Sequence, residues 1–228
     1  MTRQIRTHRR AFAVLLFVLV ACMPLVLQRV SASSNEPTIT VVGDSITASY
    51  NNRVGDARQG WWSMVGRHYG ADVTTYAEPG SGYLRRGDDC RGTRFYERPL
   101  ALLTRSPDVM IIEGGRNDWL DCRRGNYVIS STRAVRRAVN RYLDDVRMVV
   151  KPSTRIIVLG PVWGPRDAGH EARIRAIVER AAVAHEMEFV DTSNVLNRAR
   201  VLDGTHPNRA GSKALARRVM AAIGPQLA

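Results

Sequence analysis

The sequence predicts an α/β fold in which a parallel sheet of five strands is covered by helices on both faces. Two observations support this prediction: short runs rich in β-branched residues alternate with longer segments of helical periodicity, and prolines punctuate the gaps between them. Parallel strands cannot be joined by tight turns and need crossover connections, which the alternating segments supply. Ligands of such sheets bind beyond the carboxyl ends of the strands.

Each expected strand is a short apolar run rich in β-branched residues. The five runs are 38–43, 72–76, 108–113, 155–159 and 188–191. The expected helices have apolar residues at helical spacing, and they span 61–69, 93–103, 131–150, 168–186 and 208–223. Because the chain contains no internal repeat or low-complexity tract, we expect these elements to form one domain over residues 33–228.

Residues 1–32 have the pattern of an export signal. Several arginines precede an uncharged apolar run over 11–27, and small residues at 30–32 then provide a cleavage site for signal peptidase. The mature protein is therefore expected to be secreted or to lie in the cell envelope.

Other interpretations of this segment stay open. An uncleaved membrane anchor also fits, because about 20 apolar residues span a bilayer, although Pro24 and the short run argue against it. Arg9 and Arg10 partly fit a twin-arginine signal, and Cys22 lies in a sequence that fits a lipidation site. The apolar run continues past Cys22, which argues against lipidation.

The chain is strongly basic, with a formal net charge of +13. Its basic side chains are arginines apart from Lys151 and Lys213. A GC-rich coding sequence produces this bias without selection for a partner. The excess lies mostly in 131–180 and 198–218, where solvated helix faces are the simpler explanation. Association with an anionic cell envelope is the alternative, and nucleic acid is not an expected partner of an exported chain.

Cysteine usage fits an oxidising compartment. If Cys22 leaves with the signal, Cys90 and Cys122 remain as a pair that can close into a disulfide. Each of the two lies in a charged, loop-like stretch that follows a predicted strand. A bridge would join two loops on one side of the sheet, whereas two free thiols are the alternative.

Polar motifs follow four of the predicted strands, at the edge where the carboxyl ends of the strands meet. A serine hydroxyl is a poor nucleophile until an imidazole removes its proton, and that imidazole needs a third group that fixes its tautomer and stabilises its cation. The sequence supplies all three groups and predicts a serine hydrolase. The expected catalytic residues are Ser45 after the first strand, and Asp203 and His206 after the fifth.

The same edge also offers groups that could stabilise an oxyanion. A tetrahedral acyl intermediate needs preorganised hydrogen-bond donors, and the backbone amide of Ser45, the amide of Gly80 or Gly82, and the side chain of Asn117 could provide them. Glycine suits this role because its amide can be approached closely. Asp118 is expected to cap or orient its loop rather than to take part in the reaction.

Taken together, four segments resemble the motifs of the SGNH, or GDSL, hydrolases, and they extend over nearly the whole mature chain. The segments are Gly43-Asp44-Ser45, Glu78-Pro79-Gly80-Ser81-Gly82, Gly115-Arg116-Asn117-Asp118 and Asp203-Gly204-Thr205-His206-Pro207-Asn208. The resemblance implies a flavodoxin-like three-layer α/β/α fold. It also implies a cofactor-free esterase, lipase or carbohydrate deacetylase.

The resemblance assigns a role to each matching residue. The nucleophile is Ser45, the base is His206, its orienting group is Asp203, and the oxyanion donors are Ser45, Gly80 and Asn117. The second segment departs from the family pattern, because Thr75 stands where the family usually has an asparagine. This departure leaves the choice between Gly80 and Gly82 open.

A second Asp-x-x-His spacing competes for the catalytic pair. Asp167 and His170 have the same spacing as Asp203 and His206, but Asp167 lies at a predicted helix start, where aspartate is typical of a cap. The later pair follows the last strand and carries the family's glycine and proline. Motifs for a zinc helix, a Walker loop or a dinucleotide turn do not occur, so neither a metal nor a cofactor is implied.

The sequence defines the substrate less closely than the reaction. Gly82, Trp119 and Trp163 lie in loops that should face the site, and tryptophan rings could stack on sugars, although packing is their commoner role. No apolar lid is evident, which favours short acyl esters over long-chain lipids. We therefore expect a monomeric esterase that acts on a small-molecule or glycan ester, such as acetyl groups on cell-envelope glycans. An acyltransferase with the same acyl-enzyme, or a non-catalytic envelope-binding protein, is the alternative.

Overall fold

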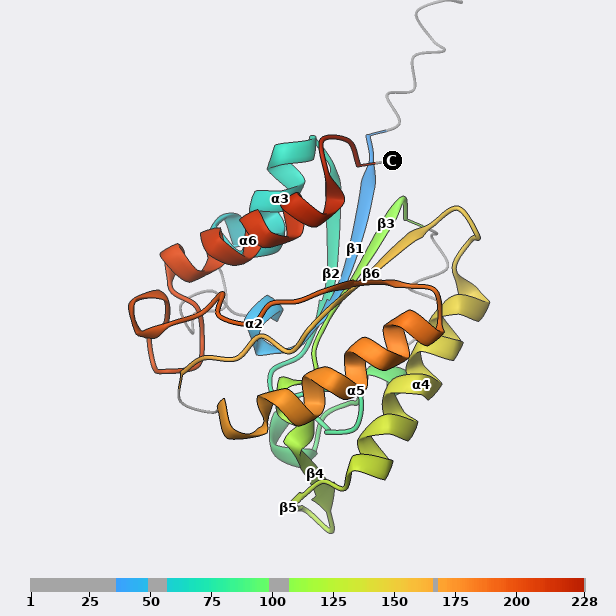
Figure 1. Ribbon diagram of the computed structural model, residues 1–228, viewed down its shortest axis with the longest axis vertical. Coiled ribbons are helices and arrows are strands. Elements are labelled where there is room, and N and C mark those ends of the chain that lie inside the picture. The colour runs from blue at the N-terminus through green and yellow to red at the C-terminus, as the bar shows by residue number, and fades with distance from the viewer. Residues whose placement is uncertain (1–35, 49–56, 99–106, 166–167, 228) are drawn as a thin grey trace, which may run out of the picture. The chain divides into compact units, whose positions relative to one another are not determined.

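Five parallel strands form the central sheet, in the order β2-β1-β3-β6-β7 (Figure 1). The computed structural model describes residues 36–48, 57–98, 107–165 and 168–227. Numbered by their order in the chain, neighbouring strands follow the doubly wound pattern of flavodoxin-like folds. The predicted fold class is therefore confirmed. The strand bounds are Thr38–Gly43 (β1), Asp72–Ala77 (β2), Val109–Glu113 (β3), Arg155–Leu159 (β6) and Glu188–Val190 (β7).

Helices cover both faces of this sheet. α3 (Trp61–Tyr69) and α6 (Arg209–Ile223) pack side by side on one face, and α4 (Thr132–Val149) and α5 (Glu171–Ala184) pack side by side on the other (Figure 1). All four lie where helical periodicity predicts them, with ends that differ from the expected ones by a few residues at most. The three layers of the predicted α/β/α architecture are present.

Alternation along each strand sends side chains into two separate hydrophobic clusters. In β3, Val109 and Ile111 belong to the cluster under α3 and α6, whereas Met110 and Ile112 belong to the cluster under α4 and α5. All four side chains are fully buried. Because both faces of β3 are covered, its sequence is continuously apolar up to Glu113.

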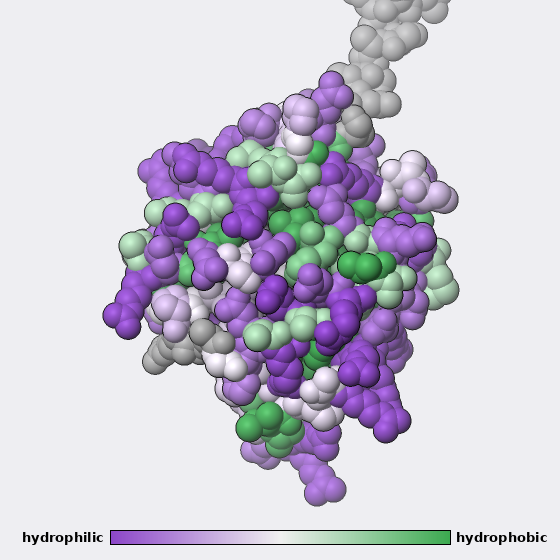
Figure 2. Space-filling view, viewed as in Figure 1, coloured by the Kyte–Doolittle hydropathy of each residue, from purple (hydrophilic) through white to green (hydrophobic). Residues whose placement is uncertain are grey.

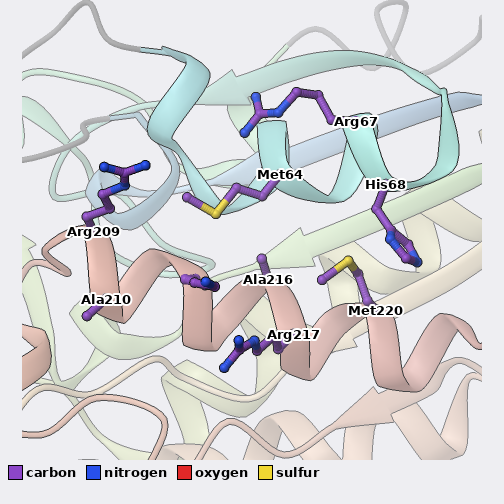
Figure 3. Close-up of a pocket in the computed structure, with 9 residues that line it drawn as sticks. Met64, Arg67, His68, Arg209, Ala210, Ala216, Arg217 and Met220 are labelled. Atoms are coloured by element: carbon purple, nitrogen blue, oxygen red, sulfur yellow. The ribbon is translucent and has the colours of Figure 1, made fainter.

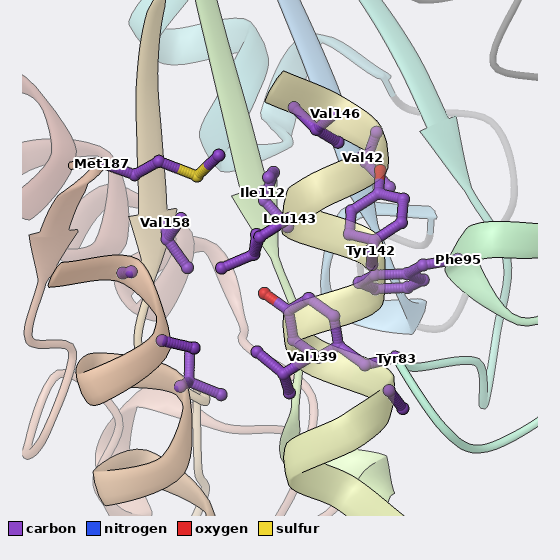
Figure 4. Close-up of a cluster of buried hydrophobic side chains, with 14 of the residues drawn as sticks. Val42, Tyr83, Phe95, Ile112, Val139, Tyr142, Leu143, Val146, Val158 and Met187 are labelled. Carbon is purple, nitrogen blue, oxygen red and sulfur yellow. The ribbon is translucent and has the colours of Figure 1, made fainter. Parts of the chain in front are cut away.

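The cluster under α4 and α5 also anchors the segment that follows β2. Figure 4 shows Tyr83 and Phe95 packed against Tyr142 of α4. The ring of Phe95 lies 5.0 Å from Tyr83 and 5.5 Å from Tyr142, measured between ring centroids. These buried rings hold the loop after β2 against the carboxyl edge of the sheet.

The predicted helix over 93–103 is wrong for its described part. Phe95–Glu97 form a single 3-10 turn, and the backbone on both sides of it is extended. Tertiary contacts override the helical pattern here, because Arg94 donates from Nε to the carbonyl of Leu84 (2.5 Å) and Glu97 accepts from Arg86 (2.7 Å). These bonds tie the segment to the loop before it. Residues 99–103 lie outside the described residues.

Two further elements were not expected from the sequence. A short helix, α2 (Ser45–Ala48), follows β1 directly, and an antiparallel hairpin of β4 (Leu120–Arg123) and β5 (Asn126–Ile129) follows β3. The Sγ atoms of Cys90 and Cys122 lie 2.17 Å apart, at disulfide-bonding distance, and this contact joins the hairpin to the loop after β2.

The expected export signal at 1–32 lies outside the described residues. Among the residues that the structure describes, no helix is long and apolar enough to cross a membrane. Within the same ranges, no group of His, Cys, Asp and Glu side chains has the arrangement of a metal site.

Candidate active site

Ser45 lies at the first position of α2, where the chain turns sharply after β1. Asp44 caps this helix: its backbone carbonyl accepts a hydrogen bond from Thr47 N (3.2 Å), and its carboxylate Oδ1 accepts one from Ile46 N (2.8 Å). Gly43 leaves the space that the turn requires, since a Cβ atom at this position would lie 2.4 Å from Thr47 Oγ1. Local packing thus accounts for Gly43, and helix capping accounts for Asp44.

His206 and Asp203 reach Ser45 from the loop that follows β7. His206 Nε2 lies 2.9 Å from Ser45 Oγ, and His206 Nδ1 lies 2.8 Å from Asp203 Oδ2. The other carboxylate oxygen of Asp203 accepts hydrogen bonds from the backbone amides of Thr205 (2.9 Å) and His206 (2.8 Å). The arrangement is that of a serine, a base and an orienting carboxylate joined in series.

The competing histidine lies elsewhere. The ring of His170 stacks on Trp119 with a centroid distance of 4.6 Å and an interplanar angle of 8°. Asp167, its expected partner, lies outside the described residues. The structure therefore brings His206, and not His170, against Ser45.

Asn117 lies beside the serine turn, in the 3-10 turn that follows β3. Its Nδ2 atom donates to Asp44 Oδ2 (3.0 Å) and to the carbonyl of Ser81 (2.9 Å). An amide nitrogen carries two hydrogens, and both have an acceptor here. Donation to an oxyanion would therefore require one of these bonds to be shared or exchanged.

The two candidate glycines differ in what their amides do. The amide of Gly82 donates to the carbonyl of Arg85 (3.0 Å), and a Cβ atom at Gly82 would lie 2.3 Å from Asp118 Oδ1. Gly80 has a φ of +75°, which favours glycine, and its amide has no acceptor among the described residues. The Gly80 amide is therefore the one of the two that is available to a ligand, whereas Gly82 serves the packing of the loop.

The buried carboxylate of Asp118 organises the loop that follows β2. It is fully buried, and its carboxylate accepts hydrogen bonds from the amides of Tyr83 (3.0 Å), Leu84 (2.9 Å) and Arg85 (2.9 Å). Burial raises the pKa of Asp118 to about 6, although the three amide bonds act in the opposite direction. The side chain thus orients the loop after β2, as its place beside Asn117 suggested.

Sequence reasoning missed a second buried carboxyl group, that of Glu113 at the end of β3. Its Oε2 atom accepts hydrogen bonds from Asp44 N (3.2 Å) and from Thr47 Oγ1 (2.9 Å), so it lies directly behind the serine turn. Burial and the neighbouring Asp44 carboxylate raise the pKa of Glu113 well above its usual range. A lone glutamate ending a wholly apolar strand was the signal that could have revealed it.

The two tryptophans proposed to line the site have different environments. Trp163 is only 4% exposed and belongs to the core under α4 and α5, so the expectation that its ring is open to substrate is not met. The guanidinium of Arg116 lies 5.6 Å from the centre of the Trp163 ring and donates to Thr205 Oγ1 (3.3 Å). Trp119 is half-buried and presents its stack with His170. Sequence reasoning did not single out Arg116 as a neighbour of the catalytic loop.

Comparison with known proteins gives one family match. The model of the GDSL-like lipase/acylhydrolase family matches residues 41–214, a range that includes every residue of the Ser45–His206–Asp203 arrangement. A search of curated protein sequences finds no match.

Solved structures with a similar fold include several carbohydrate esterases. Est24, a carbohydrate acetylesterase from Sinorhizobium meliloti, is 14% identical with a TM-score of 0.64, over 81% of this chain and 96% of that one. A family two carbohydrate esterase from Clostridium thermocellum, solved with cellohexaose, is 19% identical with a TM-score of 0.63, over 82% and 63%. A family 2 enzyme from Corynascus thermopiles (Myceliophthora fergusii) is 20% identical with a TM-score of 0.61, over 85% and 67%. At these identities the likeness establishes the fold.

Proposed function

The chain belongs to the GDSL-like lipase/acylhydrolase family and is a carboxylic ester hydrolase, and from this premise we propose that it is an exported serine esterase for short acyl groups, such as acetyl groups on cell-envelope glycans. One observation carries the proposal: His206 joins Ser45 Oγ to the Asp203 carboxylate through two hydrogen bonds of 2.9 and 2.8 Å.

The proposed reaction has two steps. His206 Nε2 takes the proton of the Ser45 hydroxyl while Oγ attacks the ester carbonyl, and the Asp203 carboxylate stabilises the imidazolium that forms. The tetrahedral intermediate collapses with loss of the alcohol, which receives the proton from His206 and leaves an acyl-enzyme. Water then attacks the acyl group by the same route, so that the carboxylic acid is released and the Ser45 hydroxyl is restored.

The backbone amides of Ser45 and Gly80 and the side chain of Asn117 are proposed to hold the oxyanion. Asn117 is held in reach of the serine turn by its bond to Asp44. Developing negative charge is a stronger acceptor than the neutral carbonyl of Ser81, which supports transfer of one Asn117 hydrogen bond to the oxyanion in the transition state.

Two observations support a glycan ester as substrate. The stacked Trp119 and His170 rings provide a flat, partly exposed surface of the kind that packs against sugar rings. Three proteins of similar fold are carbohydrate esterases, one of them solved with cellohexaose. A monomer with residues 33–228 as the mature domain, released from a signal at 1–32, is part of the proposal. The compact unit that begins at Pro37 supports the domain bounds.

Labelling with a fluorophosphonate probe, combined with turnover of acetylated glycans and of esters of increasing acyl length, tests the proposal. We expect Ser45→Ala to abolish labelling, and Ser45→Ala and His206→Ala each to lower kcat by about 10³-fold or more. His170→Ala is the matched control and should keep its catalytic rate on simple acyl esters, which do not need the surface formed by Trp119 and His170. Labelling that persists in Ser45→Ala would overturn the nucleophile. Adding a sugar acceptor distinguishes a transferase, which would modify the acceptor faster than it releases free acid.

The Asn117 assignment has its own test. Asn117→Ala should lower kcat by about 10² to 10³-fold with little change in KM, because an oxyanion donor acts mainly in the transition state. Full turnover in this variant would remove Asn117 from the oxyanion site and leave the nucleophile assignment intact.

A further inference from the structure

A cationic groove runs between α3 and α6, on the helix layer next to the catalytic edge. It encloses about 790 Å³. Its cationic side chains are Arg67 from α3, and Arg209, Lys213 and Arg217 from α6. A smaller cavity of about 350 Å³ shares Arg67 and Arg209 and extends the same surface toward Arg58. We propose that this groove binds the phosphate headgroups of anionic phospholipids and so docks the protein on a negatively charged membrane surface.

The floor of the groove is apolar. Figure 3 shows Met64 and Met220 extending from the two helices toward the space between them, with Ala216 nearby and the guanidinium groups of Arg67 and Arg217 further out. Methionine side chains adapt their shape and are common on binding surfaces that accept varied apolar groups. A cationic rim over such a floor is complementary to a phosphate group attached to a glycerol and the start of an acyl chain.

The positive charge of this groove is not balanced by nearby acids. Neither α3 nor α6 contains an acidic residue, and Arg209, Lys213 and Arg217 form no ion pair with any residue in the described ranges. On the opposite helix layer, Arg141 pairs with Asp145 and Arg175 with Glu179. Some arginines of that layer, such as Arg136 and Arg180, also lack an ion pair among the described residues. The α3–α6 layer differs because neither of its helices carries an acidic residue that could offset the positive charge.

The chemistry of the lining favours phosphate over a neutral glycan. Guanidinium groups bind phosphate oxygens through two parallel hydrogen bonds. On the face seen in Figure 2, hydrophilic side chains predominate over α6 and surround small hydrophobic patches. Basic and apolar side chains together are the combination by which proteins bind anionic membrane surfaces.

The groove lies near the proposed active site, so a membrane bound there would be close to the catalytic residues. Arg209 begins α6 directly after the segment from His206 to Asn208, and Asn208 caps this helix by accepting a hydrogen bond from Gly211 N (3.0 Å). A surface held at the groove would therefore lie next to the loop that carries the base. This inference concerns binding and is independent of the chemistry proposed for Ser45.

The test compares co-sedimentation with vesicles of phosphatidylglycerol and of phosphatidylcholine at fixed ionic strength. The double variant Lys213→Glu with Arg217→Glu should bind phosphatidylglycerol vesicles at least about tenfold more weakly than the unaltered protein. The matched control is Arg136→Glu with Arg180→Glu, which makes the same change of charge in a cavity between α4 and α5. This control should lose less than about threefold.

Each outcome bears on the proposal. Equal losses in the two double variants, or no preference for phosphatidylglycerol vesicles, would overturn it, because binding would then follow net charge or be absent. Met64→Ser with Met220→Ser, which keeps the charge, should also weaken vesicle binding. Competition by glycerol phosphate at millimolar concentration that abolishes vesicle binding would instead identify a site for a soluble phosphate. Ester turnover of the groove variants on a soluble substrate should remain unchanged and shows that they are folded.

Discussion

Glu113 is a fully buried ionisable residue behind the turn that carries Ser45. Its Oε2 atom accepts hydrogen bonds from the amide of Asp44 and the hydroxyl of Thr47, while its buried Oε1 atom has no hydrogen-bond partner in the part of the chain that the structure describes. The raised pKa favours the neutral carboxylic acid of Glu113 over its carboxylate more strongly than in a free glutamate. The turn is therefore held by the carboxyl group of Glu113, whose ionisation would be costly so close to the Asp44 carboxylate.

A neutral Glu113 can be imitated by an amide. Glu113→Gln keeps an acceptor oxygen and should change the free energy of unfolding by less than about 1 kcal/mol, whereas Glu113→Ala leaves two buried donors without an acceptor and should cost about 2 to 4 kcal/mol. Because the pKa of Glu113 is raised, its contribution to the free energy of unfolding falls as the pH rises toward and through that pKa. Glutamine does not titrate, so Glu113→Gln should become more stable relative to the unaltered protein at high pH. Urea unfolding of the three proteins across pH measures this, and equal losses in both variants would contradict it.

Asp118 should give the protein a measurable pH dependence. Its pKa of about 6 exceeds the value of about 4 in an unfolded chain, so between these values the native state holds a proton that the unfolded state has released. Its contribution to the free energy of unfolding is therefore largest below about pH 4 and falls by about 3 kcal/mol as the pH rises to about 7. Asp118→Asn cannot ionise and should lack this slope.

Urea denaturation of unaltered protein and Asp118→Asn at several pH values tests this expectation. Asp121→Asn, in the neighbouring strand β4, serves as a control for the loss of a carboxylate. The same slope in Asp118→Asn and in the unaltered protein would rule out Asp118 as its source.

Residues that carry local signals were the ones predictable from sequence. Ser45, Asn117 and His206 stand in short motifs, and the parallel topology sends all of them to one edge of the sheet. Glu113 and the choice between Gly80 and Gly82 depend on contacts between segments far apart in the chain, as the 69-residue separation of Asp44 and Glu113 shows. A glutamate at the end of an apolar strand draws attention to itself, but no local pattern identifies the distant residue that it contacts.

Among the elements, the loop after β2 shows why the helix expected from residue 93 does not form. The carboxylate of Glu78 binds the amide of Thr93 (2.8 Å) and also its hydroxyl, which closes the loop onto its own start. Asp88, Asp89 and Cys90 all have positive φ values, a conformation that non-glycine residues adopt rarely. Loop closure by these partly buried hydrogen bonds outweighs the helical pattern of apolar residues here.

The contact between Cys90 and Cys122 should stabilise this loop as a disulfide. The closed loop of 32 residues predicts a loss of about 3 to 4 kcal/mol on reduction or in Cys90→Ala with Cys122→Ala, because the unfolded chain gains freedom. Activity should also fall, since the backbone amide of Asp88 bonds to Pro79 (3.1 Å) beside the proposed oxyanion donor Gly80.

Thermal melts and ester turnover with and without reductant measure this effect. The double alanine variant is the control, because it should no longer respond to reductant. An unaltered protein whose mass after alkylation shows two free thiols in non-reducing buffer would contradict the bridge.

For the molecule as a whole, alternating apolar strands and helices were sufficient to predict the class and the parallel sheet. β1, β6 and α3 have the bounds that the sequence predicts. The hairpin β4–β5 was not predicted because its sequence lacks a strong apolar pattern. Its large hydrophobic side chains Tyr127 and Ile129 are exposed rather than buried in the core. Burial of apolar side chains leaves a clear pattern in the strands of the central sheet, but not in a small hairpin at the surface.

Residues 33–228 should fold and act without the preceding segment. Both hydrophobic clusters of the described structure consist of residues from Ile39 onward. A protein that begins at residue 33 should therefore have the thermal midpoint and turnover of the full chain, as calorimetry and ester hydrolysis would show. A protein that begins at residue 45, and so lacks β1 from the interior of the sheet, is the control expected to be unfolded. Aggregation of the protein that begins at residue 33 would contradict an independent domain.

The two ends of the hydrogen-bonded chain from Ser45 to Asp203 come from the first and last strands of the sheet in sequence order. As the polypeptide leaves the ribosome, the proposed nucleophile Ser45 emerges early and its proposed base His206 almost last. A nascent chain thus holds an inert alcohol until the closing helix has docked. We therefore expect reactivity toward esters only once the fold is complete.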